Sequence, residues 1–247
     1  MTVTGTVARI LACGIAVLLV SCIDGREEYW FAGDGSGRAD IRYTLPAATT
    51  RMYGGDTGLR EMVAGFLKDT PAITSSHHEI VTEGNHTRVR IHFGFASALD
   101  LKEIVSGPSL KYLPAAASHL AGEMQADLRG RTLEVSRKIS PAKALPGSIF
   151  LPSSQFEACR LVYIMHLPAA ATESNATRVE DDGRTLVWDF ALAQAVQTPV
   201  ITRFKMDIPI PWKFVTRIAL LLVMVCGVAF LVVRKLRRRR ADPTAPD

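Results

Sequence analysis

The sequence is poor in cysteine and lacks the short motifs that mark common enzyme classes. Four cysteines occur in 247 residues, and only Cys159 lies outside the two apolar end segments. One cysteine leaves the part between those segments without an internal disulfide, so that part must be stable through its core. Gly-x-Ser-x-Gly, His-Glu-x-x-His, a phosphate-binding glycine loop and paired-cysteine metal motifs are all absent. We therefore predict no catalytic residues, no metal site, no cofactor and a protein that is not an enzyme.

The longest apolar run covers residues 214–233 and is followed by six cationic residues. As a helix it would measure about 30 Å, the thickness of a bilayer's hydrocarbon core. Cationic residues collect on the cytoplasmic side of membrane spans. The pattern predicts a transmembrane helix over 213–233, a cytoplasmic tail over 234–247, and an extracytoplasmic domain before them.

The positive charge of the chain is concentrated in that tail. The net charge is +5, but residues 23–212 hold 20 lysines and arginines against 22 acidic residues. A basic surface for nucleic acid is therefore not expected on the domain. Attraction of the tail to anionic membrane lipid explains the basic composition better.

The N-terminus reads as a secretory signal. Arg9 precedes an apolar core that is too short to span a bilayer comfortably, and the segment ends Leu19-Val20-Ser21-Cys22. This end resembles a bacterial lipobox, which implies a signal peptide over 1–21 and diacylation of Cys22. An ordinary signal or an uncleaved anchor is the alternative. With both anchors in place, the protein would sit in the cytoplasmic membrane as a single-pass lipoprotein.

Residues 22–212 show the patterns of an α+β domain. Apolar and polar residues alternate on both sides of turn residues, which predicts three hairpins; their strands cover 26–31 and 38–45, 77–83 and 87–95, and 178–180 and 184–190. Residues 59–67 repeat apolar side chains at helical spacing, a second helix is expected over 115–128, and 160–167 reads as a central strand. The predicted fold is an antiparallel sheet of hairpins covered by one or two helices, followed by the single C-terminal transmembrane helix.

Two weaker chemical interpretations were weighed. Four of the six histidines fall in the second hairpin, but neither cysteine nor a convergent carboxylate accompanies them at a ligand spacing. They are expected to be exposed strand residues. Cys159 and His166 could form a nucleophile and base, although a lone small thiol usually packs in a core.

A family resemblance rests on both ends of the domain. The lipobox, the segment REEYWFAGDGSGRADIRYTL, and the late segments YIMHLP and SNATRVEDDGRTLVWDF are similar to the LppM-like domain family of bacterial membrane lipoproteins. The resemblance implies an α+β envelope domain that meets lipids. It carries over no catalytic motif, and the matching residues are expected at turn and core positions.

These observations lead to a functional hypothesis. The protein would be a membrane-anchored lipoprotein whose domain binds a lipid or an envelope protein without catalysis. Its partners would be membrane lipid and such a ligand, with no nucleic acid. We expect an apolar groove between the sheet and the helix over 59–67, with Phe66 and Phe93 in its lining. Two alternatives stay open: these side chains fill the core, or the protein is a membrane-tethered hydrolase.

Overall fold

The computed structural model describes residues 23–145, 148, 152–209, 222, 224 and 225. The chain divides into two units, Met1–Pro209 and Ile210–Asp247. In the second unit the described residues are Leu222, Met224 and Val225, which are helical and exposed.

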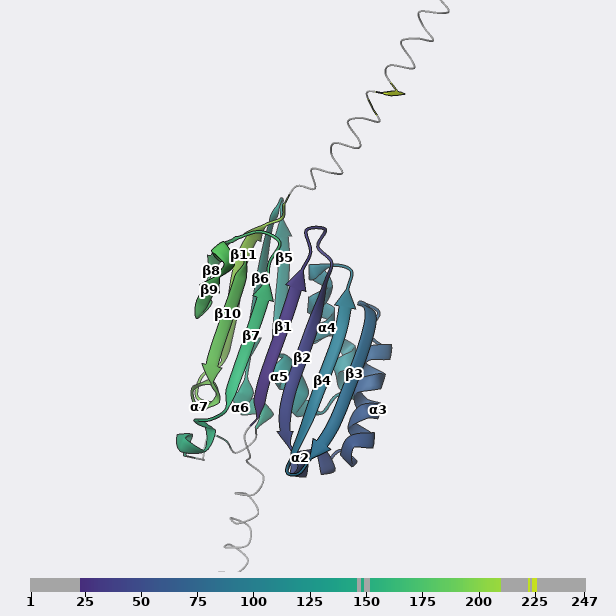
Figure 1. Ribbon diagram of the computed structural model, residues 1–247, viewed down its shortest axis with the longest axis vertical. Coiled ribbons are helices and arrows are strands. Elements are labelled where there is room, and N and C mark those ends of the chain that lie inside the picture. The colour runs from purple at the N-terminus through teal and green to yellow at the C-terminus, as the bar shows by residue number, and fades with distance from the viewer. Residues whose placement is uncertain (1–22, 146–147, 149–151, 210–221, 223, 226–247) are drawn as a thin grey trace, which may run out of the picture. The chain divides into compact units, whose positions relative to one another are not determined.

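The first unit is built on a large sheet of seven strands in the order β3-β4-β2-β1-β7-β10-β9 (Figure 1). Its strands are β1 (Asp24–Phe31), β2 (Gly37–Pro46), β3 (Ile73–Glu83), β4 (His86–Phe95), β7 (Arg160–His166), β9 (Arg178–Glu180) and β10 (Thr185–Ala191). The three hairpins predicted from alternation are confirmed, because β1 pairs with β2, β3 with β4 and β9 with β10. β7 lies between β1 and β10, as expected of a central strand.

The prediction of a purely antiparallel sheet is wrong at one place. β1 and β7 run parallel, with Gly25 opposite Leu161. Parallel neighbours need a long connection, and here more than a hundred residues lie between the two strands. Alternation within a strand reports which face is buried, not which distant strand lies alongside it, so the sequence pattern could not reveal this pairing.

A second sheet of four strands has the order β5-β6-β11-β8. Its strands are β5 (Glu123–Arg129), β6 (Thr132–Ile139), β8 (Ala171–Ser174) and β11 (Val200–Asp207). It packs on the inner face of the large sheet, since the ring of Phe204 lies 6.3 Å from that of Phe31 and 6.5 Å from that of Trp188. The core therefore lies between two layers.

β5 corrects the helix predicted over 115–128. The helix α5 (Ala115–Ala121) ends at Gly122, whose φ of +75° favours glycine. A strand follows at once and pairs with β6 across the turn at Gly130. The small residues that suggested a longer helix thus belong to two different elements.

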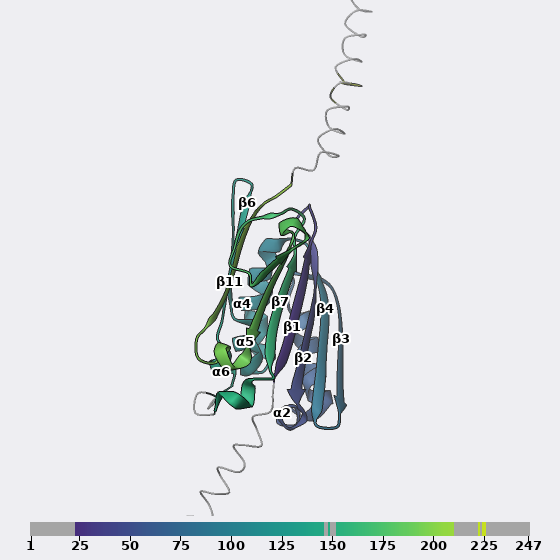
Figure 2. The same ribbon diagram turned by 60° about the vertical axis from the view of Figure 1, so that its left-hand side comes forward.

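Helices complete the inner layer beside the second sheet. They are α2 (Ala47–Arg51), α3 (Gly55–Lys68), α4 (Leu101–Ser106), α5, α6 (Pro141–Ala144) and α7 (Leu192–Ala195), with short 3-10 turns at Ala98–Asp100, Pro108–Tyr112, Ser153–Phe156 and Asp181–Gly183. α3 confirms the amphipathic helix expected over 59–67, and it buries Leu59, Val63, Phe66 and Leu67. Figures 1 and 2 show α3, α4 and α5 on one side of the large sheet, while its other face is open.

The prediction of a C-terminal transmembrane helix is corrected. Within the described ranges no helix is long and apolar enough to cross a membrane. The longest, α3, has 14 residues, and a span needs about 20. The prediction of a single-pass protein in the cytoplasmic membrane depends on that helix and is corrected as well. The described residues form a mixed α+β structure. The signal peptide 1–21, the tail 234–247 and most of 213–233 lie outside the described residues.

Cys159 is the one cysteine among the described residues. Its side chain is fully buried just before β7, and it is disulfide-bonded. The sequence predicts that the part between the two end segments has no internal disulfide, and that part holds no second cysteine. The other three cysteines, Cys13, Cys22 and Cys226, lie outside the described residues.

Candidate functional site

An apolar cavity of about 780 Å³ lies between the large sheet and the helices that cover its inner face. One wall consists of inward residues of β4, namely Val89, Ile91 and Phe93. The facing wall comes from α3 and α4, which alternate apolar residues at helical spacing. Its side chains are Leu59, Val63, Phe66, Ile104 and Val105. A volume of this size falls in the range of small-molecule and lipid sites.

The two residues predicted to line a groove both lie in this cavity. Phe66 comes from α3 and Phe93 from β4, so the cavity has the sheet wall and the helix wall that the sequence suggested. Their part in binding a ligand stays a prediction.

Polar lining residues come from other elements. Thr50 on α2 and Ser148 after α6 have buried hydroxyls that lack a hydrogen-bond partner among the described residues. His119 on α5 and Lys143 on α6 line the same cavity and are exposed. A buried hydroxyl without a partner costs about 1–3 kcal/mol, so a ligand or water that supplied one would be favoured. The cavity is thus apolar toward α3, α4 and β4, and polar toward the short helices.

A buried ion pair stands in the cavity wall. Glu27 of β1 and Arg137 of β6 meet across the two sheets, with side chains 3% and 1% exposed. Nη1 of Arg137 donates to Oε2 of Glu27 at 2.6 Å, and Nη2 donates to Oε1 at 3.1 Å. The same guanidinium donates to the carbonyl oxygens of Ala121 at 2.6 Å and Leu120 at 3.2 Å. It therefore fastens the end of α5 to both sheets.

Tyrosine hydroxyls complete the shell of the carboxylate. Tyr29 and Tyr43 donate to Glu27 at 2.7 and 2.6 Å. Burial alone would raise the pKa of Glu27, but the charge and hydrogen bonds of Arg137, with the two hydroxyls, outweigh burial and lower that pKa. Burial and the neighbouring carboxylate raise the pKa of both tyrosines well above the usual value. Glu27 therefore stays ionised and fully engaged at neutral pH.

Sequence reasoning missed this pair, although a signal was present. Glu27 is in phase with the inward residues Tyr29 and Phe31, and Arg137 is in phase with Val135 and Ile139. A charged residue at an inward position of an alternating strand is expected to have a buried partner. What the pattern could not supply was the identity of that partner, 110 residues away.

The other candidate residues do not come together. Cys22, the predicted lipidation site, lies outside the described residues. Cys159 is in a disulfide, and His166 contacts Glu28 at 2.8 Å and Thr185 at 3.1 Å. The thiol of Cys159 is therefore not available as a nucleophile for His166.

Comparisons with known proteins were made at the level of sequence and of structure. No family model matches the chain, and no curated protein matches it. Structural similarity is weak. The LppM folded domain of Mycobacterium tuberculosis gives a TM-score of 0.49 at 11% identity, covering 77% of this chain and 92% of that one.

Two further solved structures are less similar. The Fcho1 mu homology domain of Danio rerio with a bound Eps15 peptide gives a TM-score of 0.24 at 12% identity, with coverage of 78% and 82%. An M1 zinc metallopeptidase of Deinococcus radiodurans gives 0.28 at 11% identity, with coverage of 75% and 41%. At these scores no function is transferred, and the resemblance to the LppM-like family stays a prediction.

Proposed function

We propose that the domain binds a lipid without catalysis, and that the lipid's acyl chain lies in the cavity between the large sheet and α3. The observation that carries the proposal is a cavity of about 780 Å³ with a wholly apolar wall on α3, α4 and β4. A chain buried there would gain about 0.8 kcal/mol per methylene. Part of this gain offsets the loss of freedom on binding.

The distribution of polar groups favours an amphiphile over a plain hydrocarbon. Thr50 and Ser148 present unpartnered hydroxyls, and Lys143 and His119 add polar atoms at exposed positions in the same lining. An oxygen-bearing headgroup could accept from these donors while its chain occupies the apolar wall. The ligand expected is therefore a lipid with an anionic or hydroxylated head.

Binding without catalysis is consistent with the hydrogen bonds of the two charged residues Glu27 and Arg137. Glu27 is held by Arg137 and two tyrosine hydroxyls, and Arg137 is held by Glu27 and two carbonyls. A general base needs a free lone pair within reach of a substrate proton. Of the carboxylates in the described residues, Glu27 is the one that lines this cavity, and its surroundings favour a structural role.

The test is a titration of the purified, delipidated full-length protein with fluorescent fatty acids of 10, 12, 14 and 16 carbons. Each added pair of methylenes should improve affinity by roughly 1.6 kcal/mol, about fifteenfold, until the cavity is full. Absence of saturable binding, or affinity that does not depend on chain length, would contradict the proposal.

A cavity-filling variant provides the matched control. Val63→Trp places a bulky apolar ring in the cavity wall, and Val179→Trp makes the same change on the exposed edge strand β9. We expect Val63→Trp to weaken binding by at least about tenfold and Val179→Trp to leave it unchanged. Thermal unfolding of both variants shows whether the fold is intact. Equal affinities of the two variants would place the lipid elsewhere.

A further inference from the structure

Several arginines lie in a row on the open face of the large sheet, and they do not line the apolar cavity. In the register of β1, β2 and β4, Arg26 is opposite Arg42, and Arg42 is opposite Arg90. Like charges on neighbouring strands repel one another, so such a row needs compensation. The next row supplies it with two carboxylates, Asp40 and Glu28, which are also directly opposite each other.

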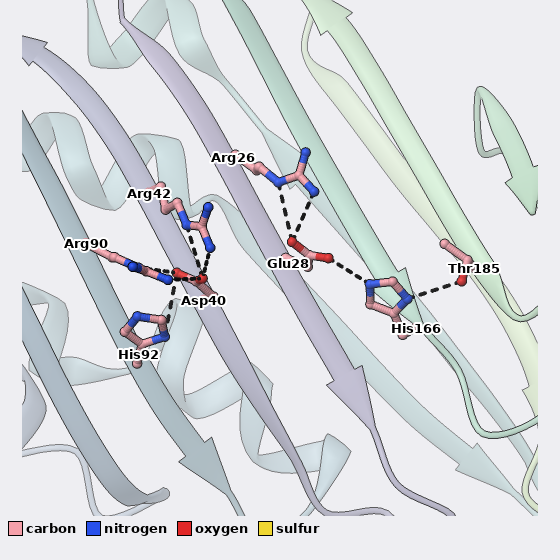
Figure 3. A network of polar contacts seen from close by, with 8 residues as sticks. All are labelled: Arg26, Glu28, Asp40, Arg42, Arg90, His92, His166 and Thr185. Carbon is pink, nitrogen blue, oxygen red and sulfur yellow. Dashed lines mark hydrogen bonds and ion pairs between the residues drawn. The ribbon is translucent and has the colours of Figure 1, made fainter.

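Asp40 and Glu28 pair with different numbers of arginines (Figure 3). Glu28 pairs with Arg26 at 3.1 Å and with His166 at 2.8 Å. Asp40 accepts from Arg42 and, at 3.1 Å, from Arg90, while His92 lies 3.6 Å away. Asp40 thus has two permanently charged partners where Glu28 has one.

A third row contains a stack. The guanidinium of Arg38 lies 4.8 Å from the ring centre of Trp30, and the imidazole of His166 stacks on the same ring with the two ring centres 5.2 Å apart. Within the described part of the chain, the guanidinium of Arg38 forms no ion pair and no hydrogen bond. Its donors are therefore free, and the ring of Trp30 holds its position.

A shallow hollow of about 500 Å³ opens beside this stack. Gly94 lines the hollow and lies opposite Arg38 in the β2–β4 register. A Cβ at Gly94 would come within 2.8 Å of the Ser75 and Thr74 hydroxyl oxygens, so a side chain there would fill the hollow. His77 and His92 line it from β3 and β4. The rim thus carries imidazole, hydroxyl and guanidinium groups.

The charge beside the hollow is positive. Asp40 accepts from the guanidiniums of Arg42 and Arg90, and it lines the hollow together with Arg38. Burial opposes ionisation of Asp40, but hydrogen bonds from Arg42 and Arg90 outweigh it and lower the pKa of Asp40 to about 2. The carboxylate is fully ionised at neutral pH. Glu79 lies opposite Arg90 in the β3–β4 register, so two carboxylates accompany the three guanidiniums and an excess of one positive charge remains.

We propose that this hollow binds a phosphate ester, with Arg38 as the residue that contacts it. A phosphate offers several acceptor oxygens in the geometry that a guanidinium matches with two parallel hydrogen bonds. The imidazoles of His77 and His92 and the hydroxyl of Ser75 provide further donors around the same space. The site is separate from the apolar cavity, because it lies on the opposite face of the sheet.

The experiment uses the full-length protein and two probes. Glycerol 3-phosphate is titrated by calorimetry, and sedimentation compares phosphatidylcholine vesicles with and without phosphatidylglycerol. Arg38→Gln removes the charge at the hollow, and Arg38→Lys keeps it without the guanidinium geometry. Arg178→Gln is the matched control, since Arg178 is an exposed arginine of the same sheet on the distant strand β9.

We expect saturable binding that Arg38→Gln weakens by about tenfold to a hundredfold, that Arg38→Lys weakens less, and that Arg178→Gln leaves unchanged. This pattern with glycerol 3-phosphate alone identifies soluble phosphate esters, and the same pattern with anionic vesicles identifies a lipid headgroup. Absence of binding to both probes overturns the proposal, as does equal weakening by Arg38→Gln and Arg178→Gln. Val63→Trp should not alter this binding, so failure here is distinguishable from failure of the lipid cavity.

Discussion

Replacement of Arg137 by methionine is expected to destabilise the domain by about 3–5 kcal/mol, the usual cost of breaking a buried ion pair. The Arg137 side chain is 1% exposed, and it donates twice to Glu27 and once each to the carbonyls of Ala121 and Leu120. Its removal leaves the Glu27 carboxylate buried, with the two tyrosine hydroxyls as its remaining side-chain donors. The carbonyls of Ala121 and Leu120 lose their hydrogen-bond donor. Methionine fills much of the space, so the cavity contribution is small.

The double replacement separates charge from packing. Glu27→Leu with Arg137→Met removes both charges, and buried ion pairs replaced by apolar residues often cost little stability. We expect the double variant to be more stable than Arg137→Met alone, with a coupling energy of at least about 2 kcal/mol. The remaining loss would come from the hydroxyls of Tyr29 and Tyr43, which no longer have their acceptor, and from the carbonyls of Ala121 and Leu120, which no longer have their donor.

The assay is urea unfolding followed by circular dichroism, with the midpoint and the slope fitted separately. The pKa of Glu27 in the fold lies below its ordinary value of 4.5. Its stabilising contribution is therefore complete above pH 4.5 and is lost as the pH falls through the lowered pKa. In Arg137→Met burial is no longer outweighed and raises the pKa of Glu27, so the difference from wild type should shrink as the pH falls from that raised pKa through the lowered pKa of the wild type. A loss below about 1 kcal/mol at pH 7, or no coupling in the double variant, would refute this account of the pair.

Three further predictions concern other parts of the fold. Asp40→Asn should abolish a stabilising contribution that is complete above pH 3.8 and lost toward pH 2, because the pKa of Asp40 is lowered to about 2; acid unfolding of the two proteins checks this. Gly122→Ala should cost about 1–3 kcal/mol by urea unfolding, since φ is +75° and the new Cβ would lie 2.4 Å from the Lys138 carbonyl oxygen. Non-reducing peptide mapping should recover the Cys159 peptide cross-linked, and a map that shows a free Cys159 thiol would contradict it.

Local patterns predicted most individual elements. The hairpins of β1 with β2 and β3 with β4 follow from alternation around turn residues, and α3 follows from apolar spacing. These signals are local, because strand faces repeat every two residues and helix faces every three or four. The helix expected over 115–128 failed where a local signal was ambiguous. Small residues there fit a helix, and the glycine at 122 was the one sign of its end.

The candidate site could likewise be predicted from the sequence only in part. Phe66 and Phe93 could be placed on facing walls from sequence, because each lies on the apolar face of its own element. Whether those walls touch or leave a cavity depends on the distance between layers. That distance is set by packing over the whole core, including contacts between residues far apart in the chain.

The amino-acid sequence by itself determined most of the strands and helices and which of their faces turn inward. Tertiary structure alone decided that β1 runs parallel to β7 and that Glu27 pairs with Arg137 across two sheets. It also decided that Arg26, Arg42 and Arg90 lie side by side on neighbouring strands of the open face. The physical reason is that pairing between distant segments is selected by the summed burial and hydrogen bonding of the complete fold, which no short window of sequence contains.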